Sequence, residues 1–282
     1  MTARIDASRS IVIENVEPEL NCGRYAVKRE VGDTLEVSAD IFKEGHDAIA
    51  AAIRYRAEDE SEWREERMRF VENDRWTGVC RLDRNIRYLY TVVAWTDHFG
   101  SWASELRKKF DAGQDVAGEL LEGAKIVRGA LGRAQGDDRA RLELLLHEMT
   151  TDDAQAARVA VALDPALQLL VARYPDRSDL TQYDHLLPVQ VDRVRARFAA
   201  WYELFPRSMS DDPNRHGTFD DVIRKLPYVR DMGFDVLYFP PIHPIGRSHR
   251  KGKNNTLNPE PGEPGVPYAI GSEEGEIGRA HV

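Results

Sequence analysis

Two hydrophobic segments near the end of the 282-residue chain constrain its fold most, because each runs directly into a polar loop. The first is Phe198–Ser208 (FAAWYELFPRS) and the second is Gly233–Gly246 (GFDVLYFPPIHPIG). Between them, Thr218–Met232 has the apolar spacing of an amphipathic helix, and Thr218 with Asp221 approximates a capping box. We therefore predict a β-α-β unit whose two parallel strands end at one edge of a sheet. The predicted strands are Phe198–Phe205 and Phe234–Phe239.

The loop after the second strand, Pro240–Asn255 (PPIHPIGRSHRKGKNN), concentrates cationic and amide side chains. In β/α barrels, the loops that follow the strands build the active site. Lys251, Asn254 and Asn255 provide donors and acceptors that suit sugar hydroxyls or a sugar phosphate. They are candidate substrate-binding residues, and the alternative is a solvated basic loop. His243, between two prolines, is a further candidate that would donate to a substrate oxygen or instead bond the loop backbone.

Residues 1–100 have the pattern of an antiparallel, immunoglobulin-like β-sandwich. Short β-branched or aromatic segments follow one another at about ten-residue spacing, with turn-forming residues and no helical pattern between them. The predicted strands are Ile11–Val16, Thr34–Ile41, Ile49–Arg56, Trp63–Phe70, Trp76–Leu82 and Ile86–Asp97. The predicted core residues are Trp76, Val79, Tyr90, Val92 and Trp95.

At Ser101 the apolar residues become three and four apart, which predicts an inserted α-helical bundle over residues 101–185. Asp137, Asp153 and Asp164 lie where N-caps or first-turn acids are favoured. Residues 186–194 return to strand character, and Pro188 predicts that they complete the sandwich as an edge strand. The predicted helices are Ser101–Phe110, Val116–Ala130, Asp137–Met149, Asp153–Leu163 and Asp164–Arg173.

Composition excludes several classes of function. The net charge of −9 at pH 7 argues against nucleic acid as a partner, because phosphate neutralisation needs a basic face. Cys22 and Cys80 lack the spacing of a zinc site or a disulfide framework, so we expect neither a metal nor a cofactor. The sequence contains no apolar run of about 18 residues and no signal-peptide core, which predicts a cytoplasmic protein without membrane contact.

Three parts of the chain have sequences more specific than a general pattern. They are AWYELFPRS, DDVIRKLPYVRDMGFDVLYFPPIHPIG and RKGKNN within residues 198–255; YTVVAWTDHFGSW at Tyr90–Trp102; and LPVQVDR at Leu187–Arg193. Together they closely resemble the α-1,4-glucan:maltose-1-phosphate maltosyltransferase family, in the α-amylase clan (glycoside hydrolase family 13). The resemblance extends to Gly275. It implies that residues 195–275 are the first β-α-β unit of a truncated (β/α)8 (TIM) barrel.

The resemblance also implies a function in carbohydrate metabolism, in the biosynthesis of an α-glucan such as glycogen. The family transfers maltosyl from α-maltose 1-phosphate to the non-reducing end of an α-1,4-glucan with retention, releasing phosphate. In the family the catalytic carboxylates come from barrel strands four, five and seven. The resemblance implies that this chain is an N-terminal fragment without those strands, so we expect it to contain no catalytic residue and to be inactive alone. Lys251 matches the family's donor-binding lysine, and its neighbours Asn254 and Asn255 are added as a hypothesis. The family's N-terminal domains imply a homodimer.

An alternative function is a non-catalytic glucan-binding or dimerisation module of an amylase-clan enzyme. Trp63 and Trp102 are the candidate aromatic platform for a glucan, and burial in a core or an interface is the other interpretation of these two side chains.

The last residues, 276–282, depart from the family. Ile277–Val282 (IGRAHV) back-translates to ATCGGAAGAGCACACGTC, which matches a common sequencing-library adapter. We hypothesise that residues 276–282 are an adapter-derived artefact, and the codons in the nucleotide sequence test this.

Overall fold

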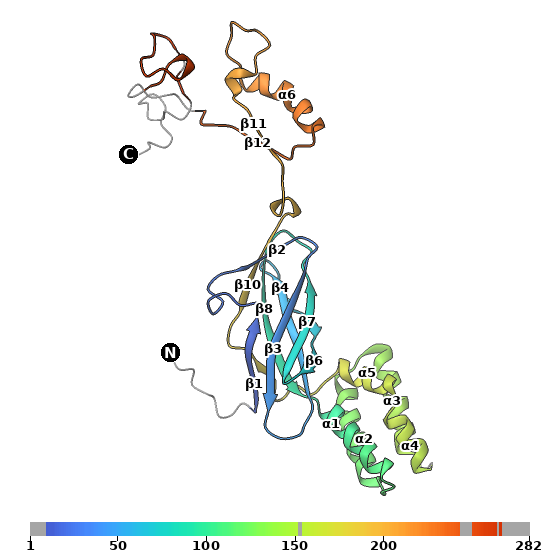
Figure 1. Ribbon diagram of the computed structural model, residues 1–282. Coiled ribbons are helices and arrows are strands. Elements are labelled where there is room, and N and C mark those ends of the chain that lie inside the picture. Colours follow the sequence, from blue (N-terminus) through green and yellow to red (C-terminus); the bar gives the residue numbers. More distant parts are fainter. Residues whose placement is uncertain (1–9, 152–153, 243–249, 264, 267–282) are drawn as a thin grey trace. The chain divides into compact units, whose positions relative to one another are not determined.

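The computed structural model describes residues 10–151, 154–242, 250–263 and 265–266 (Figure 1). The chain divides into two compact units, an N-terminal unit of residues 1–193 and a C-terminal unit of residues 194–282. Among the described residues, the N-terminal unit holds two β-sheets and five α-helices, and the C-terminal unit holds a two-stranded sheet and one α-helix. The chain is therefore a mixed α/β protein.

The first sheet has the strand order β1-β3-β7-β6, and all of its pairs are antiparallel. The second has the order β2-β10-β8-β4-β5, with β9 paired to β8. Its one parallel pair joins β10 to β2. The strands of the first sheet are β1 (Ile11–Glu17), β3 (Thr34–Lys43), β7 (Arg75–Arg81) and β6 (Arg69–Glu72). Those of the second are β2 (Val27–Glu30), β10 (Leu187–Asp192), β8 (Arg87–Thr96), β4 (Ile49–Ala57), β5 (Arg64–Arg67) and β9 (Thr181–Gln182).

The two sheets share one hydrophobic core. Strand side chains alternate between faces, and in β3 the alternate residues Leu35, Val37, Ala39 and Ile41 are buried. They belong to the same hydrophobic cluster as Tyr88, Tyr90, Val92 and Ala94 of β8 in the other sheet. Each large apolar side chain buried in this way contributes about 1.5–3 kcal/mol. The inner faces of the two sheets are therefore packed against each other.

The predicted core is correct for Tyr90 and Val92 and wrong for Val79. Val79 is 55% exposed, because Gly78 and Cys80 take the inward positions of β7 and the alternation turns Val79 outward. Trp76 is half-buried at the edge of the cluster. Trp95 is buried on the opposite face of β8, in a small cluster with Ala52 and Val93, where Arg67 and Arg177 lie against its ring at 4.6 and 4.2 Å.

Most predicted strands are confirmed within two residues at each end, but Trp63–Phe70 is not one strand. It is divided into β5 and β6, which belong to different sheets. Between them Met68 is buried, and its backbone N–H donates to the carbonyl of Ala51 at 2.9 Å. The chain thus crosses from one sheet to the other at Met68, and a buried methionine inside a polar run gives little sequence signal for such a crossing.

The prediction that residues 186–194 form an edge strand is wrong. Strand β10 lies between β2 and β8, and the edge position belongs to β2, which the sequence pattern did not predict. Pro188 is tolerated because it faces Leu89 of β8, whereas pairing with β2 begins only at Val189. The proline therefore lies beyond the end of the neighbouring strand, inside an otherwise central one.

The five predicted helices of the N-terminal unit are confirmed within three residues at each end. They are α1 (His98–Asp111), α2 (Ala117–Arg133), α3 (Gly136–Thr150), α4 (Gln155–Ala162) and α5 (Pro165–Arg173). Their buried residues form a second hydrophobic cluster, separate from that of the sheets. Of the helices described, none is by itself long and apolar enough to cross a membrane; only the bent pair α4 and α5 passes that test, by length and composition alone.

Aspartates set two of these helix starts. Asp97 caps α1 by accepting from the Gly100 N–H at 2.9 Å, so the helix begins three residues before the predicted Ser101. Asp164 caps α5 as predicted, accepting from the Ala166 N–H at 2.7 Å. Such caps contribute about 1 kcal/mol each. Asp137 lies in the first turn of α3, also as predicted, and Asp153 lies outside the described residues.

The C-terminal unit contains the predicted β-α-β unit. Strands β11 (Trp201–Glu203) and β12 (Val236–Tyr238) pair in parallel, and α6 (Phe219–Asp231) connects them. Val222 and Val229 of α6 pack with Leu204. The capping box at Thr218 is present, and Gly233 ends the helix with φ +88°, a conformation that glycine adopts without strain.

The strands of the C-terminal unit are shorter than predicted and are partly exposed. Each has three residues, and β12 is not buried on both faces: Val236 and Leu237 are half-buried and Tyr238 is 41% exposed. The reason is that, within the described residues, α6 is the one α-helix of this unit and covers one face of the pair.

Candidate functional site

The loops that follow the two parallel strands meet around one cavity. Because β11 and β12 run in parallel, the chain leaves both at the same edge of the sheet. The cavity, of about 760 Å³, is lined by residues that follow β11 and by the loop over residues 252–266. We call it the rim cavity. Its lining residues are Phe205, Arg207, Gly252, Lys253, Asn254, Asn255, Pro261, Gly262, Glu263, Gly265 and Val266.

Backbone geometry fixes the shape of the loop over residues 252–263. Asn254 and Asn255 have φ of 55° and 62°, in the left-handed region that asparagine tolerates better than most residues. The Glu263 carboxylate accepts from the backbone N–H groups of Lys253, at 3.2 Å, and Glu260, at 3.0 Å. A Cβ at Gly252 would lie 2.8 Å from the Cα of Pro259 and 2.2 Å from that carboxylate, so the loop closes this tightly only with glycine there.

Arg207 connects the two loops. It belongs to η2 (Pro206–Ser208), the short 3₁₀ turn that follows β11. Its guanidinium donates to the carbonyl of Gly265 at 2.8 Å, and its own carbonyl accepts from the Gly217 N–H at 2.8 Å. Arg207 is half-buried and lines the cavity. It is therefore part of the cavity wall as well as the residue that connects the two loops.

The structure brings two of the four predicted site residues to the rim cavity. Asn254 and Asn255 line it and are exposed, so their amides are available to a ligand. Lys251 immediately precedes the lining segment and is half-buried. His243 lies outside the described residues, so its predicted role is untested.

Two cationic side chains, Arg207 and Lys253, line the cavity. Lys253 belongs to the cationic loop that the sequence indicated, whereas sequence reasoning did not select Arg207. The position of Arg207 directly after a predicted strand was a signal that could have found it. With two cations, two amides and one carboxylate, the cavity offers hydrogen bonds to sugar hydroxyls and positive charge to a phosphate. In the part of the chain that the structure describes, no group of three or more His, Cys, Asp or Glu side chains could hold a metal ion.

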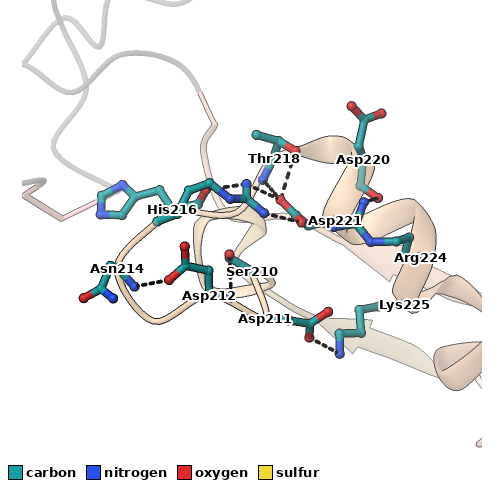
Figure 2. A network of polar contacts seen from close by, with 11 residues as sticks. Ser210, Asp211, Asp212, Asn214, His216, Thr218, Asp220, Asp221, Arg224 and Lys225 are labelled. Atoms are coloured by element: carbon teal, nitrogen blue, oxygen red, sulfur yellow. Dashed lines mark hydrogen bonds and ion pairs between the residues drawn. The ribbon is translucent and has the colours of Figure 1, made fainter.

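A buried carboxylate lies where the loop after β11 enters α6 (Figure 2). Asp221 is 1% exposed, and it accepts from the backbone N–H and the hydroxyl of Thr218 at 2.6 and 3.0 Å. Arg215 donates two hydrogen bonds to it, at 2.8 and 2.9 Å, and Arg224 donates a further one. The Arg215 guanidinium, together with the Thr218 N–H, holds the pKa of Asp221 well below its usual range.

The two tryptophans considered as a glucan platform differ in their surroundings. Trp102 is buried within the helical bundle and donates from its indole N–H to the carbonyl of Glu119 at 2.7 Å, so it cannot stack on a sugar. Trp63 is half-buried, with the guanidinium groups of Arg54 and Arg56 over its ring at 5.5 and 5.1 Å. The burial interpretation is therefore correct for Trp102, and neighbouring arginines occupy the ring of Trp63.

Comparison with known proteins gives a family for this chain. The family described as "Alpha-1,4-glucan:maltose-1-phosphate maltosyltransferase, domain N/S" matches residues 9–193. Curated proteins named alpha-1,4-glucan:maltose-1-phosphate maltosyltransferase also match over nearly the whole chain. One from Myxococcus xanthus is 49% identical over 98% of this chain and 42% of its own length. One from Cereibacter sphaeroides is 48% identical (95% and 40%), and one from Pseudomonas aeruginosa is 43% identical (94% and 40%).

These relatives are all glycosyltransferases by name. The chain belongs to the α-1,4-glucan:maltose-1-phosphate maltosyltransferase family. It spans about 40% of the length of the curated relatives it matches. The similarity covers the N-terminal unit and also the segments that build the rim cavity, because 98% of the chain is aligned with the Myxococcus xanthus protein.

Proposed function

We propose that this chain is the N-terminal part of a retaining glycosyltransferase that transfers maltosyl from α-maltose 1-phosphate to the non-reducing end of an α-1,4-glucan and releases phosphate. The observation that carries the proposal is the 49% identity, over 98% of the chain, to a protein named for that reaction. The catalytic carboxylates would come from the part of the protein that follows this chain. The proposed setting is glucan synthesis in the cytoplasm.

The finer description of the fold is part of this proposal. The two sheets with a shared core suggest an immunoglobulin-like sandwich over residues 1–100, completed by residues 186–194. Helices α1–α5 would be a bundle inserted over residues 101–185. The parallel β11-α6-β12 unit would begin a (β/α)8 catalytic barrel over residues 195–275. We also propose that the N-terminal unit forms a homodimer, which sedimentation of the protein at varied concentration tests.

The rim cavity is the proposed site for part of the donor. Asn254 and Asn255, at the cavity wall, would hydrogen-bond sugar hydroxyls. Lys251 would supply a charged donor beside them, and His243 is proposed as a further donor. A charge-assisted hydrogen bond to a buried ligand contributes about 1.5–3 kcal/mol, which is roughly a tenfold to hundredfold effect on binding.

Phosphate release by the full-length protein tests the proposal. With α-maltose 1-phosphate and glycogen we expect phosphate release together with glucan elongation. The variant Lys251→Met is expected to raise the donor KM at least tenfold, on the hydrogen-bond energy above. Lys225→Met is the matched control, because Lys225 pairs with Asp211 at 3.0 Å on the surface of α6, and it should leave the donor KM unchanged. Glucan hydrolysis without phosphate release would overturn the proposed function.

A further inference from the structure

The Asp221 carboxylate accepts more hydrogen bonds than a helix cap needs. A capping box uses the carboxylate at the third helical position to satisfy one backbone N–H at the helix start. Asp221 does this through Thr218, yet it also receives two hydrogen bonds from Arg215 and one from Arg224 while being 1% exposed. The bidentate geometry of the Arg215 contact fixes the position of an arginine that belongs to the loop and not to the helix.

The end of the loop that contains the fixed arginine is in contact with η2. Arg215 lies two residues before Gly217, and its guanidinium also donates to the carbonyl of His216 at 3.1 Å. The Gly217 N–H donates to the carbonyl of Arg207 at 2.8 Å. A Cβ on Gly217 would lie 2.2 Å from the carbonyl oxygen of Pro206, so the backbone at this point is in direct contact with the 3₁₀ turn. Gly217, two residues after the fixed Arg215, therefore joins the end of the loop to η2.

The turn η2 in turn carries the side chain that ties the two rim loops. Arg207 donates to the carbonyl of Gly265 and shares the cavity wall with Asn254 and Asn255. A shift of η2 would move the guanidinium, its tie to Gly265 and that wall together. The contacts thus form a continuous series from the start of α6, through Arg215, Gly217 and Arg207, to the rim cavity.

We propose that Asp221 is a positioning residue for the donor site, acting through Arg215 and Arg207 on the loop over residues 252–266. The inference rests on the proposed function, because that loop is the proposed donor site. Asp221 itself does not line the cavity and has no contact with a substrate in this proposal. Its part is to hold the cavity wall in the geometry that binds the maltosyl phosphate.

Donor kinetics of the full-length protein test the proposal with matched aspartate-to-asparagine variants. Asp221→Asn is expected to lower kcat/KM for α-maltose 1-phosphate about tenfold or more, since small displacements at a site cost up to about a hundredfold. The KM for the glucan acceptor should stay unchanged. Asp211→Asn is the control, because it removes the exposed pair with Lys225 between the same loop and the same helix. Equal donor parameters in the two variants would overturn the proposal, as would a loss of activity that only follows the unfolded fraction.

A second variant and a readout independent of activity complete the test. Arg207→Met removes the tie to Gly265 while leaving the cap of α6 intact, so it addresses the case in which Asp221→Asn fails to fold. Amide hydrogen exchange over residues 252–263 should become faster in Asp221→Asn and Arg207→Met and remain unchanged in Asp211→Asn. Unchanged exchange in all three would overturn the positioning role even if the protein is an active maltosyltransferase. A wild-type protein that releases no phosphate would instead refute the proposed function, while the exchange experiment would still decide the positioning role.

Discussion

Replacing Gly123 with alanine is expected to destabilise the N-terminal unit, although alanine normally stabilises a helix. Gly123 lies inside α2, where alanine is more favourable than glycine by about 0.5–1 kcal/mol. A Cβ at this position would lie 1.9 Å from Cζ2 of Trp102 and 2.4 Å from two further ring atoms. Trp102 is 5% exposed, and its indole N–H donates to the carbonyl of Glu119, so the ring cannot move away without breaking contacts in the bundle core.

The magnitude follows from these opposing effects. Overpacking a core by one methyl group costs about 1–3 kcal/mol, and loss of the indole hydrogen bond costs about 0.5–1.5 kcal/mol more. After the helix-propensity gain is allowed for, we expect a net destabilisation of about 0.5–4 kcal/mol for Gly123→Ala.

Gly129→Ala is the matched control within the same helix. The nearest atoms to a Cβ at Gly129 are those of the flexible Arg133 side chain, at 3.7 and 3.9 Å, which is ordinary contact. This variant should therefore be more stable than the wild type by about 0.5–1 kcal/mol. Urea unfolding followed by far-ultraviolet circular dichroism measures both variants. A stability change of the same sign in both, or a Gly123→Ala variant as stable as the wild type, would refute the close packing of α1 on α2.

Three further predictions follow from the burial of single side chains. Leu106→Ala should destabilise the bundle by about 2–5 kcal/mol, measured by the same urea unfolding, because Leu106 is fully buried in the cluster of helices α1–α5. A thiol reagent should modify the exposed Cys22 in the native protein and reach the buried Cys80 only after unfolding. Burial also raises the pKa of the Cys80 thiol to about 12, which keeps it protonated and unreactive. Rapid modification of both thiols in the native protein would contradict the burial of Cys80. The pKa of Asp221 is lowered in the folded state, so its ionised form stabilises the fold above the ordinary carboxyl pKa of about 4. The loss of thermal stability caused by Asp221→Asn should therefore shrink as the pH falls below about 4, and a loss that is constant with pH would be the contrary result.

Local sequence patterns predicted the elements of the fold well and their long-range pairing poorly. The spacing of apolar residues located all five bundle helices, and Asp164 and Thr218 marked helix starts as expected. Whether β10 is central or at the edge depends on which strand pairs beside Val189, and that strand, β2, is far away in the sequence. Pro188 indicated an edge strand, because the sequence alone does not show that β2 ends before the position opposite Pro188.

In the candidate site, too, the sequence predicted local features but not long-range contacts. The amides of Asn254 and Asn255 were found from composition and from their place after a strand. The contacts that hold them were not, because they join positions distant in the chain: Arg207 to Gly265 across 58 residues, and Lys253 to Glu263 across ten. The burial of Asp221 was not predicted either. Arg215, one of the two arginines that pair with it, lies in a loop whose sequence has no regular spacing of apolar residues.

Amide hydrogen exchange of the full-length protein, with and without α-maltose 1-phosphate, tests the central claim most directly. If the rim cavity holds the donor, ligand should slow exchange over residues 252–263 and around Arg207 and leave the helices of the N-terminal unit unchanged. Protection confined to the N-terminal unit, or phosphate release without protection of the 252–263 segment, would contradict the claim that this part of the chain binds the donor.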